Sequence, residues 1–239
     1  MDPVADARAV VDEKFPAALA AFLGGSAVTE QRTPMSDLDI VVLLSGAPAP
    51  YRESLQHGHW PVELFVHTEE SWRTFVEREI SKRGSPLLWM CAEGVLLLDR
   101  DGVGEKIAAK ARKLAAAGVP RATVEELEDR RYGITDLLDD LAGCADGGER
   151  LFIVTELARR AAELVLVVNG AWLGGGKWLA RHVDAAEPGF SERLGEAVRD
   201  ALAGRDEDLI RVVDGLLDRC GGRLWAGYRR EVPPLFGRC

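Results

Sequence analysis

Apolar residues in the first third of the chain change between helical and strand-like spacing. Residues 4–14 form a mixed helical pattern, and Pro16 interrupts it before the apolar stretch 17–23. That stretch predicts either a continuation of the helix beyond the proline or a first strand, and both interpretations stay open. The near-continuous apolar run from 39 to 44 predicts a strand buried on both faces, and residues 62–67 predict the next strand.

Two further helices are expected before residue 120. Thr68 can cap the first of them, because acids follow it in the first turn. Apolar residues then recur on one helix face at Trp72, Phe75, Val76 and Ile80. Residues 84–86 break this helix, a short strand is expected at 95–98, and an alanine-rich amphipathic helix is expected at 103–117.

From residue 123 onward the spacing is helical, and glycine or proline separates the segments. Five helices are expected, at 123–142, 149–169, 175–184, 190–203 and 206–230. The change in character predicts an α+β chain with two domains. Residues 1–120 would form a mixed sheet with helices, and residues 121–239 an all-α helical bundle.

The strongest chemical signal is a glycine-rich turn followed by two aspartates. Gly25 and Ser26 precede Asp37 and Asp39 by ten intervening residues, and an apolar run follows directly. Strand alternation sends both aspartates to one side, while their apolar neighbours face a core. Two adjacent carboxylates repel each other unless a cation lies between them, and Mg²⁺ prefers oxygen ligands together with substrate phosphates.

The turn itself has the properties of a phosphate-binding loop. Gly25 permits backbone conformations and close approaches that a side chain would block. Ser26 can offer its hydroxyl and N–H to a phosphate, most readily if a helix begins there. A triphosphate on the turn and a metal on the aspartates is the arrangement required for nucleotidyl transfer.

These residues resemble the signature of the DNA polymerase β-type nucleotidyltransferase superfamily. The fuller string over 25–42 resembles most closely its antibiotic (aminoglycoside) adenylyltransferase branch, and the likeness is specific over about residues 20–70. It implies Mg²⁺ as cofactor, ATP or another nucleoside triphosphate as co-substrate, and a nucleotidyltransferase-type sheet. It also implies a third carboxylate on a later strand, which Glu63 supplies, either as a metal ligand or as the base that deprotonates the acceptor hydroxyl.

Other candidate residues lie nearby and in the helical part. The stretch 174–178, Gly-Gly-Gly-Lys-Trp, resembles one in related enzymes where a lysine meets the triphosphate, so Lys177 is a candidate; a solvated surface lysine is the alternative. Arg32 is a second candidate for phosphate. Glu156 and Glu163 are the acids favoured for acceptor recognition or base chemistry, against the alternative of a solvated charged face.

The charge balance narrows the choice of partners. Acids outnumber bases 39 to 30, the net charge is −9, and no lysine- or arginine-rich run occurs. A nucleic-acid partner is not expected, because it would need a basic surface. A small acceptor is expected, and a cationic one, such as an aminoglycoside-like antibiotic, would be attracted by acidic walls.

Several features predict a cytoplasmic protein, and a monomer or homodimer is the expected assembly. No apolar stretch approaches the roughly 20 residues needed to span a bilayer. The N-terminus lacks the basic start and apolar centre of a signal peptide. The cysteines, expected to be reduced thiols, are Cys91, Cys144, Cys220 and Cys239. No membrane partner is expected.

The leading prediction is a metal-dependent enzyme that transfers a nucleoside monophosphate, AMP from ATP, to a hydroxyl of a small molecule, with antibiotic resistance as one outcome. One alternative is a protein-modifying antitoxin-type nucleotidyltransferase, against which the additional helical domain counts. The other is a non-catalytic nucleotide-binding regulatory domain, against which the three acids count.

Overall fold

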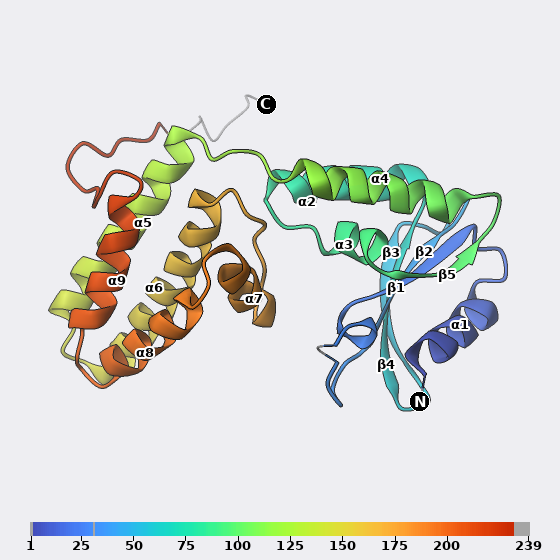
Figure 1. Cartoon of the computed structure of the whole chain (residues 1–239), viewed down its shortest axis with the longest axis horizontal. Coiled ribbons are helices and arrows are strands. Elements are labelled where there is room, and N and C mark those ends of the chain that lie inside the picture. Colours follow the sequence, from blue (N-terminus) through green and yellow to red (C-terminus); the bar gives the residue numbers. More distant parts are fainter. Residues whose placement is uncertain (1, 31, 232–239) are drawn as a thin grey trace, which may run out of the picture. The chain divides into compact units, whose positions relative to one another are not determined.

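The computed structural model describes residues 2–30 and 32–231. The chain divides into two compact units between Val119 and Pro120 (Figure 1). The first unit contains a five-stranded mixed sheet with helices, and the described residues of the second contain helices without strands. This arrangement confirms the predicted α+β fold class, with a mixed sheet followed by helices.

The first unit has its sheet strands in the order β3-β4-β2-β1-β5. Strands β2 and β4 are parallel, and the other neighbouring pairs are antiparallel. In chain order its elements are α1 (Pro3–Lys14), β1 (Ala20–Gly24), the 3-10 turn η1 (Ser26–Val28), β2 (Leu38–Leu43), β3 (Tyr51–His57), β4 (Trp60–His67), α2 (Glu69–Ser81), α3 (Pro86–Ala92), β5 (Val95–Asp99) and α4 (Val103–Ala117).

Helices cover both faces of this sheet (Figure 1). On one face Ile40 and Leu64 are fully buried in a cluster with Val10 of α1. On the other face α3 and α4 pack on β1, and α2 packs on β4. A Cβ at Gly24 would lie 2.4 Å from Cγ of Met90, so this glycine allows α3 to approach β1 closely.

Helix α2 begins as the sequence predicts. The Thr68 hydroxyl accepts a hydrogen bond from the Ser71 N–H at 3.1 Å, and the Ser71 hydroxyl accepts one from the Thr68 N–H at 2.9 Å. This reciprocal pair satisfies two N–H groups that the first turn leaves without helical partners. Trp72 and Val76 are buried as expected, whereas Phe75 on the same predicted face is 42% exposed.

Two elements of the first unit were not predicted. Strand β3 lies at a sheet edge and has exposed polar residues at Arg52, Glu53 and Ser54, so it lacks the apolar alternation that marks a half-buried strand. Helix α3 is short and apolar on most sides, which hides a helical period, although Ser85 caps it and Pro86 occupies its first position. The stretch 17–23, open between helix and strand, contributes to strand β1.

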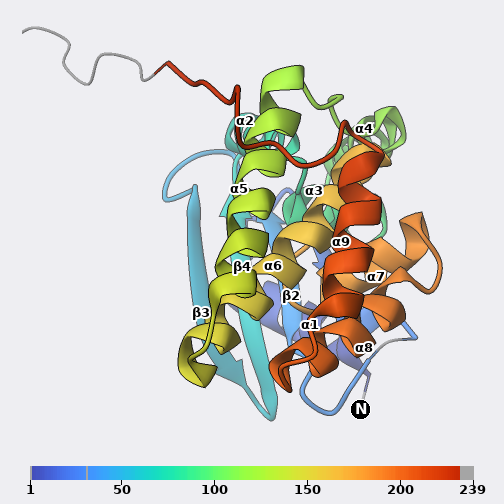
Figure 2. The ribbon, with the colours of Figure 1, turned by 90° about the vertical axis from the view of Figure 1, so that its left-hand side faces the viewer.

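The second unit is organised around one helix. Helix α6 contacts each of the other four, and its residues Leu157, Ala161 and Leu164 are fully buried (Figure 2). The helices of this unit are α5 (Val124–Gly143), α6 (Gly147–Val168), α7 (Lys177–Ala186), α8 (Phe190–Leu202) and α9 (Glu207–Asp218).

The predicted helix over 206–230 was too long, since α9 ends at Asp218. Gly221 and Gly222 follow with φ of +110° and +75°, backbone angles that do not continue a right-handed helix. The Gly222 N–H instead donates to the Leu217 carbonyl at 2.9 Å. Beyond this point Arg131 of α5 donates to the carbonyl oxygens of both glycines, so the segment is fastened to α5.

None of the helices in the described ranges has the length and apolar character needed to cross a bilayer. Cys91, Cys144 and Cys220 are free thiols, in agreement with the expected reduced state. Cys239 lies outside the described residues. Burial raises the pKa of the Cys91 thiol to about 12, so this cysteine is an inert part of the core.

Replacing Ile40 by alanine tests the packing that supports β2. Ile40 is fully buried, so Ile40→Ala should lower the free energy of unfolding of the first unit by about 2–5 kcal/mol. Urea-dependent hydrogen exchange of β2 amides in the full chain measures this change. The control Met35→Ala removes a side chain that is 87% exposed and should change stability by no more than about 0.5 kcal/mol. Equal effects would contradict the placement of Ile40 in the core.

Candidate functional site

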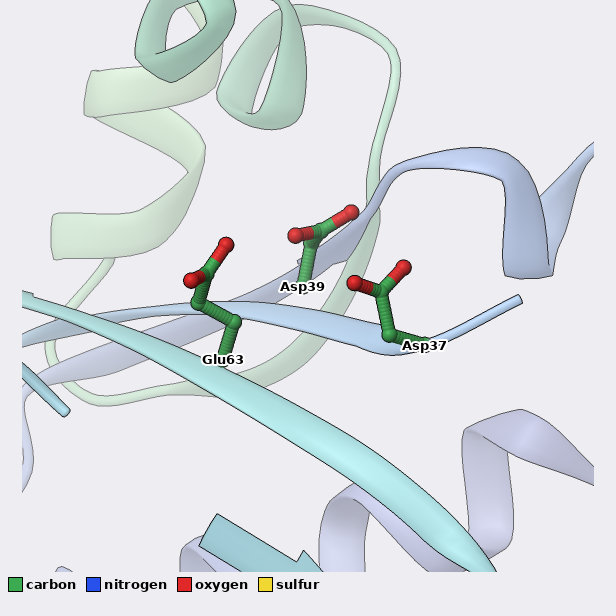
Figure 3. A group of neighbouring side chains, drawn as sticks. All are labelled: Asp37, Asp39 and Glu63. Carbon is green, nitrogen blue, oxygen red and sulfur yellow. The ribbon is translucent and has the colours of Figure 1, made fainter. Parts of the chain in front are cut away.

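Three acidic side chains gather at one place on the sheet. Asp37, Asp39 and Glu63 each offer a carboxylate oxygen, and these atoms all lie within 4.8 Å of one another. All three residues are half-buried. Figure 3 shows their carboxylates on the same side of the two neighbouring strands that carry them. The structure therefore brings together the three acids that the sequence singles out.

Strand register explains why these acids meet. Asp39 lies directly opposite Glu63 in the parallel pairing of β2 with β4. Asp37 comes two residues before Asp39 and therefore projects to the same face. Leu38 and Ile40 project to the opposite face and are fully buried there. The buried residues thus fix which way the acids point.

Two residues that sequence reasoning missed hold Glu63. An Nη2 atom of Arg52 lies 2.5 Å from Oε2 of Glu63, and the Ser54 hydroxyl donates to Oε1 at 3.4 Å. Both neighbours belong to β3, and Ser54 lies directly opposite Glu63 in the ladder. The Arg52 guanidinium also lies 4.7 Å from the centre of the Phe65 ring. They could have been found only if β3 had been recognised as a strand.

The glycine turn reaches the same site. Gly25 has a φ of +70°, a region that favours glycine, and a Cβ there would lie 2.0 Å from Oδ2 of Asp39. A side chain at this position would therefore displace the carboxylate. Its neighbour Gly24 pairs with Asp39 across the antiparallel ladder of β1 and β2. Gly25 is needed both for its backbone angles and for the space beside Asp39.

The Ser26 hydroxyl is hydrogen-bonded within the protein, and its predicted contact with phosphate stays a prediction. Ser26 and Ser36 are each 3% exposed, and their Oγ atoms lie 2.8 Å apart, which is a hydrogen bond. Ser36 also accepts from the Thr33 N–H at 3.0 Å. This hydroxyl pair ties the turn after β1 to the residue before Asp37. Sequence reasoning missed Ser36, although its place next to the aspartate pair was a usable signal.

The three acids fit a hard divalent cation. Carboxylate oxygens are the ligands that Mg²⁺ prefers, and three within 4.8 Å of one another can share one ion. The missing side chain at Gly25 lets the Asp39 carboxylate lie against the turn, where a Cβ would be only 2.0 Å from its Oδ2. Arg52 offsets part of the negative charge on Glu63, and a bound cation would offset the mutual repulsion of the set. The residues present therefore match the metal that the sequence predicts.

Two further residues are predicted phosphate ligands. Lys177 is the exposed first residue of α7, in the second unit, and its predicted role stays a prediction. Its neighbour Trp178 is 37% exposed, with the Arg181 guanidinium 4.7 Å from its ring centre. Arg32 lies over the Trp60 ring at 4.9 Å, so its contact in this structure is aromatic.

The acids favoured in the helical unit are engaged by arginines. Glu156 lies 2.7 Å from both Arg159 and Arg160, and these hydrogen bonds lower its pKa to about 2. Glu163 pairs with Arg130 at 3.3 Å and also contacts Arg159. Both acids do lie on one stretch of α6, as the two-turn spacing indicates. Each carries a positive partner, however, so a cationic ligand would have to compete with an arginine.

Comparison with known proteins does not supply a family. No protein-family model matches the chain, and no curated protein matches it. Among solved structures, the chain is similar to a nucleotidyltransferase-like protein from Exiguobacterium sibiricum 255-15. The two share 12% sequence identity with a TM-score of 0.44, over 91% of this chain and 77% of the other. Agreement at this level does not transfer an activity to this chain.

Substituting Gly25 tests its role beside Asp39. Gly25→Ala puts a methyl group where Oδ2 of Asp39 lies, so Mn²⁺ affinity should fall by about tenfold or more, equivalent to about 1.4 kcal/mol. Electron paramagnetic resonance titration with Mn²⁺ measures the affinity.

The matched control is Gly58→Ala. Gly58 also has a positive φ, +59°, but a Cβ there would meet nothing within 4 Å. It should cost about 1–2 kcal/mol of stability from backbone strain and leave Mn²⁺ affinity unchanged. Wild-type affinity in Gly25→Ala would show that the turn does not control the site.

The Ser26–Ser36 pair predicts a coupled stability effect. Ser36→Ala removes a partner from the buried Ser26 hydroxyl and from the Thr33 N–H, so it should cost about 1–3 kcal/mol. A double-mutant cycle with Ser26→Ala, measured by urea denaturation, should show a double variant less destabilised than the sum by about 0.5–3 kcal/mol. Strictly additive costs would contradict the hydrogen bond.

Proposed function

We propose that the first unit transfers a nucleoside monophosphate from a nucleoside triphosphate, ATP being the expected donor, to a hydroxyl of a small molecule. One observation carries this proposal: the carboxylates of Asp37, Asp39 and Glu63 lie within 4.8 Å of one another, beside Gly25. The same residues stand at the spacing of the nucleotidyltransferase signature. A solvated acidic surface would not require a glycine packed against one of its carboxylates.

Asp37, Asp39 and Glu63 are the residues that would hold Mg²⁺. When bound, Mg²⁺ neutralises charge on the triphosphate and on the departing pyrophosphate. Gly25 leaves room for the Asp39 carboxylate itself, so the aspartate can lie beside the turn that would meet the phosphates. Ser26 acts through the backbone of the turn, because its hydroxyl is held by Ser36. The turn and the acids are thereby fixed before substrate arrives, and such positioning supplies much of the rate in phosphoryl transfer.

The reaction exchanges one phosphorus–oxygen bond for another. The acceptor oxygen bonds to the α-phosphorus, the bond from that phosphorus to pyrophosphate breaks, and the hydroxyl proton passes to a base. Glu63 can be this base or complete the metal ligands. Among the described residues, Oε1 receives the long 3.4 Å contact from Ser54 while Oε2 is paired with Arg52, so Oε1 is the better placed to take a proton.

Further parts of the proposal rest on the sequence. Lys177, exposed at the start of α7 after three glycines, would supply a counter-charge for the triphosphate. The net charge of −9 supports a small acceptor in place of a nucleic acid. A cytoplasmic location and a monomeric or homodimeric state stay predictions. An aminoglycoside-like antibiotic as acceptor is supported by this overall charge and by the resemblance alone. The charges next to Glu63 lead to a different acceptor class.

Loss of either aspartate should abolish the reaction. Asp37→Asn and Asp39→Asn each remove a ligand charge, so Mg²⁺-dependent pyrophosphate release from ATP should fall about a hundredfold or more. The assay uses a panel of hydroxylated small molecules, and binding of Mn²⁺ with ATP gives a readout that needs no acceptor.

Glu53→Gln is the control for charge. Glu53 is exposed on β3 opposite Leu64, so its side chain belongs to the other face of the sheet, and both readouts should stay at the wild-type level. Undiminished turnover and metal–ATP binding in either aspartate variant would end the proposal.

A further inference from the structure

The edge strand β3 presents a row of hydrogen-bond donors beside the acids. Ser54 lies opposite Glu63, Arg52 opposite Phe65 and Gln56 opposite Pro61, so these three residues share the face that carries the acids. All three are exposed. The alternate residues Tyr51 and Leu55 pack against the core on the other face.

Arg52 gives this row a positive charge. Its guanidinium carries five N–H groups in a planar fork. Arg52 forms an ion pair with Glu63, and its side chain is still 61% exposed. The guanidinium carbon lies over the Phe65 ring, 4.7 Å from the ring centre. The outer N–H groups therefore remain accessible to a ligand, and β3 itself places no acid on this face, since Glu53 projects to the other.

The order of the strands places Arg52 on the acceptor side. The turn at Gly25 follows β1, which flanks β2 on one side, while β4 and then β3 flank it on the other. In phosphoryl transfer the attacking and leaving oxygens lie roughly in line across the phosphorus. With the triphosphate tail at the turn, the acceptor hydroxyl approaches from the side of Glu63. Any group carried next to that hydroxyl then meets Arg52, Ser54 and Gln56.

We infer that the acceptor carries an anionic group, a carboxylate or a phosphate, which the Arg52 guanidinium binds while the hydroxyl faces Glu63. This inference rests on the proposed function and names its substrate class. The planar fork of arginine matches both anions with two parallel hydrogen bonds. Gln56 can add a neutral donor through its second amide hydrogen, because the first donates to the Gly58 carbonyl at 3.2 Å. A cationic acceptor would bring its ammonium groups against the guanidinium, so the aminoglycoside class is disfavoured.

A series of sugars that differ in one group tests the inference. Glucose, glucuronate, glucose 6-phosphate and glucosamine share one ring and offer neutral, carboxylate, phosphate and cationic forms. Ligand-observed NMR on the full chain measures their affinities. The sample contains diamagnetic Mg²⁺ in place of Mn²⁺, together with a non-hydrolysable ATP analogue. One or both anions should bind more tightly than glucosamine by about fivefold or more, the range of an exposed but bidentate ion pair. The stronger anion identifies the group recognised.

Variants of Arg52 give the second readout. Arg52→Glu should reverse the order of glucuronate and glucosamine, and Arg52→Gln should remove the difference without reversing it. Arg8→Glu makes the same change of charge on α1, which covers the other face of the sheet, and should keep the wild-type order. Thermal unfolding shows whether each variant is folded. If Arg52→Glu does not fold, Arg52→Gln still tests the inference.

The outcomes separate this inference from the proposed function. Tighter binding of glucosamine than of both anions to the wild type, an order unchanged in both Arg52 variants, or no dependence on probe charge overturns the anionic acceptor. If metal–ATP binding nevertheless depends on Asp37 and Asp39, nucleotidyl transfer stands and the acceptor class alone is wrong. If that dependence is also missing, the proposed function itself fails.

Discussion

The parallel pairing of β2 with β4 is the constraint on which the site depends. It sets Asp39 opposite Glu63, and alternation adds Asp37 to the same face. A slip of one residue would turn every side chain of one strand to the other face and separate the acids. The register is held by side chains on the opposite face, where Leu38, Ile40 and Leu64 are fully buried. The core thus specifies the chemistry indirectly, by making one alignment of the two strands much more stable than its neighbours.

Local structure offsets the electrostatic repulsion among the three carboxylates. Three carboxylates within 4.8 Å repel one another, and in isolation the chain would separate them. Arg52 compensates Glu63, the glycine turn packs against Asp39, and the Ser26–Ser36 hydrogen bond fixes the segment that leads to Asp37. Groups held close together against repulsion are typical of functional sites, where a ligand supplies the missing compensation.

Much of the fold and of the candidate site could be predicted from the sequence where local patterns are strong. The cap at Thr68, the helix at 103–117 and the strand before Leu44 carry clear signals. Asp37 and Asp39 were found from strand alternation, and Glu63 because the family resemblance implies a third acid on a later strand. Strand β3 escaped notice because an edge strand needs no apolar alternation, and Arg52 and Ser54 were missed with it. Ser36 was missed because a buried hydroxyl pair depends on a contact across ten residues.

The polar character of β3 has a consequence for the protein in solution. An edge strand exposes unpaired N–H and C=O groups that can recruit a strand from another molecule, and charged side chains on the edge prevent such association. Arg52 and Glu53 place opposite charges on the two faces of this edge. A change that made the strand apolar would therefore favour aggregation as well as removing the donors beside Glu63, so ligand recognition and solubility constrain the same few residues.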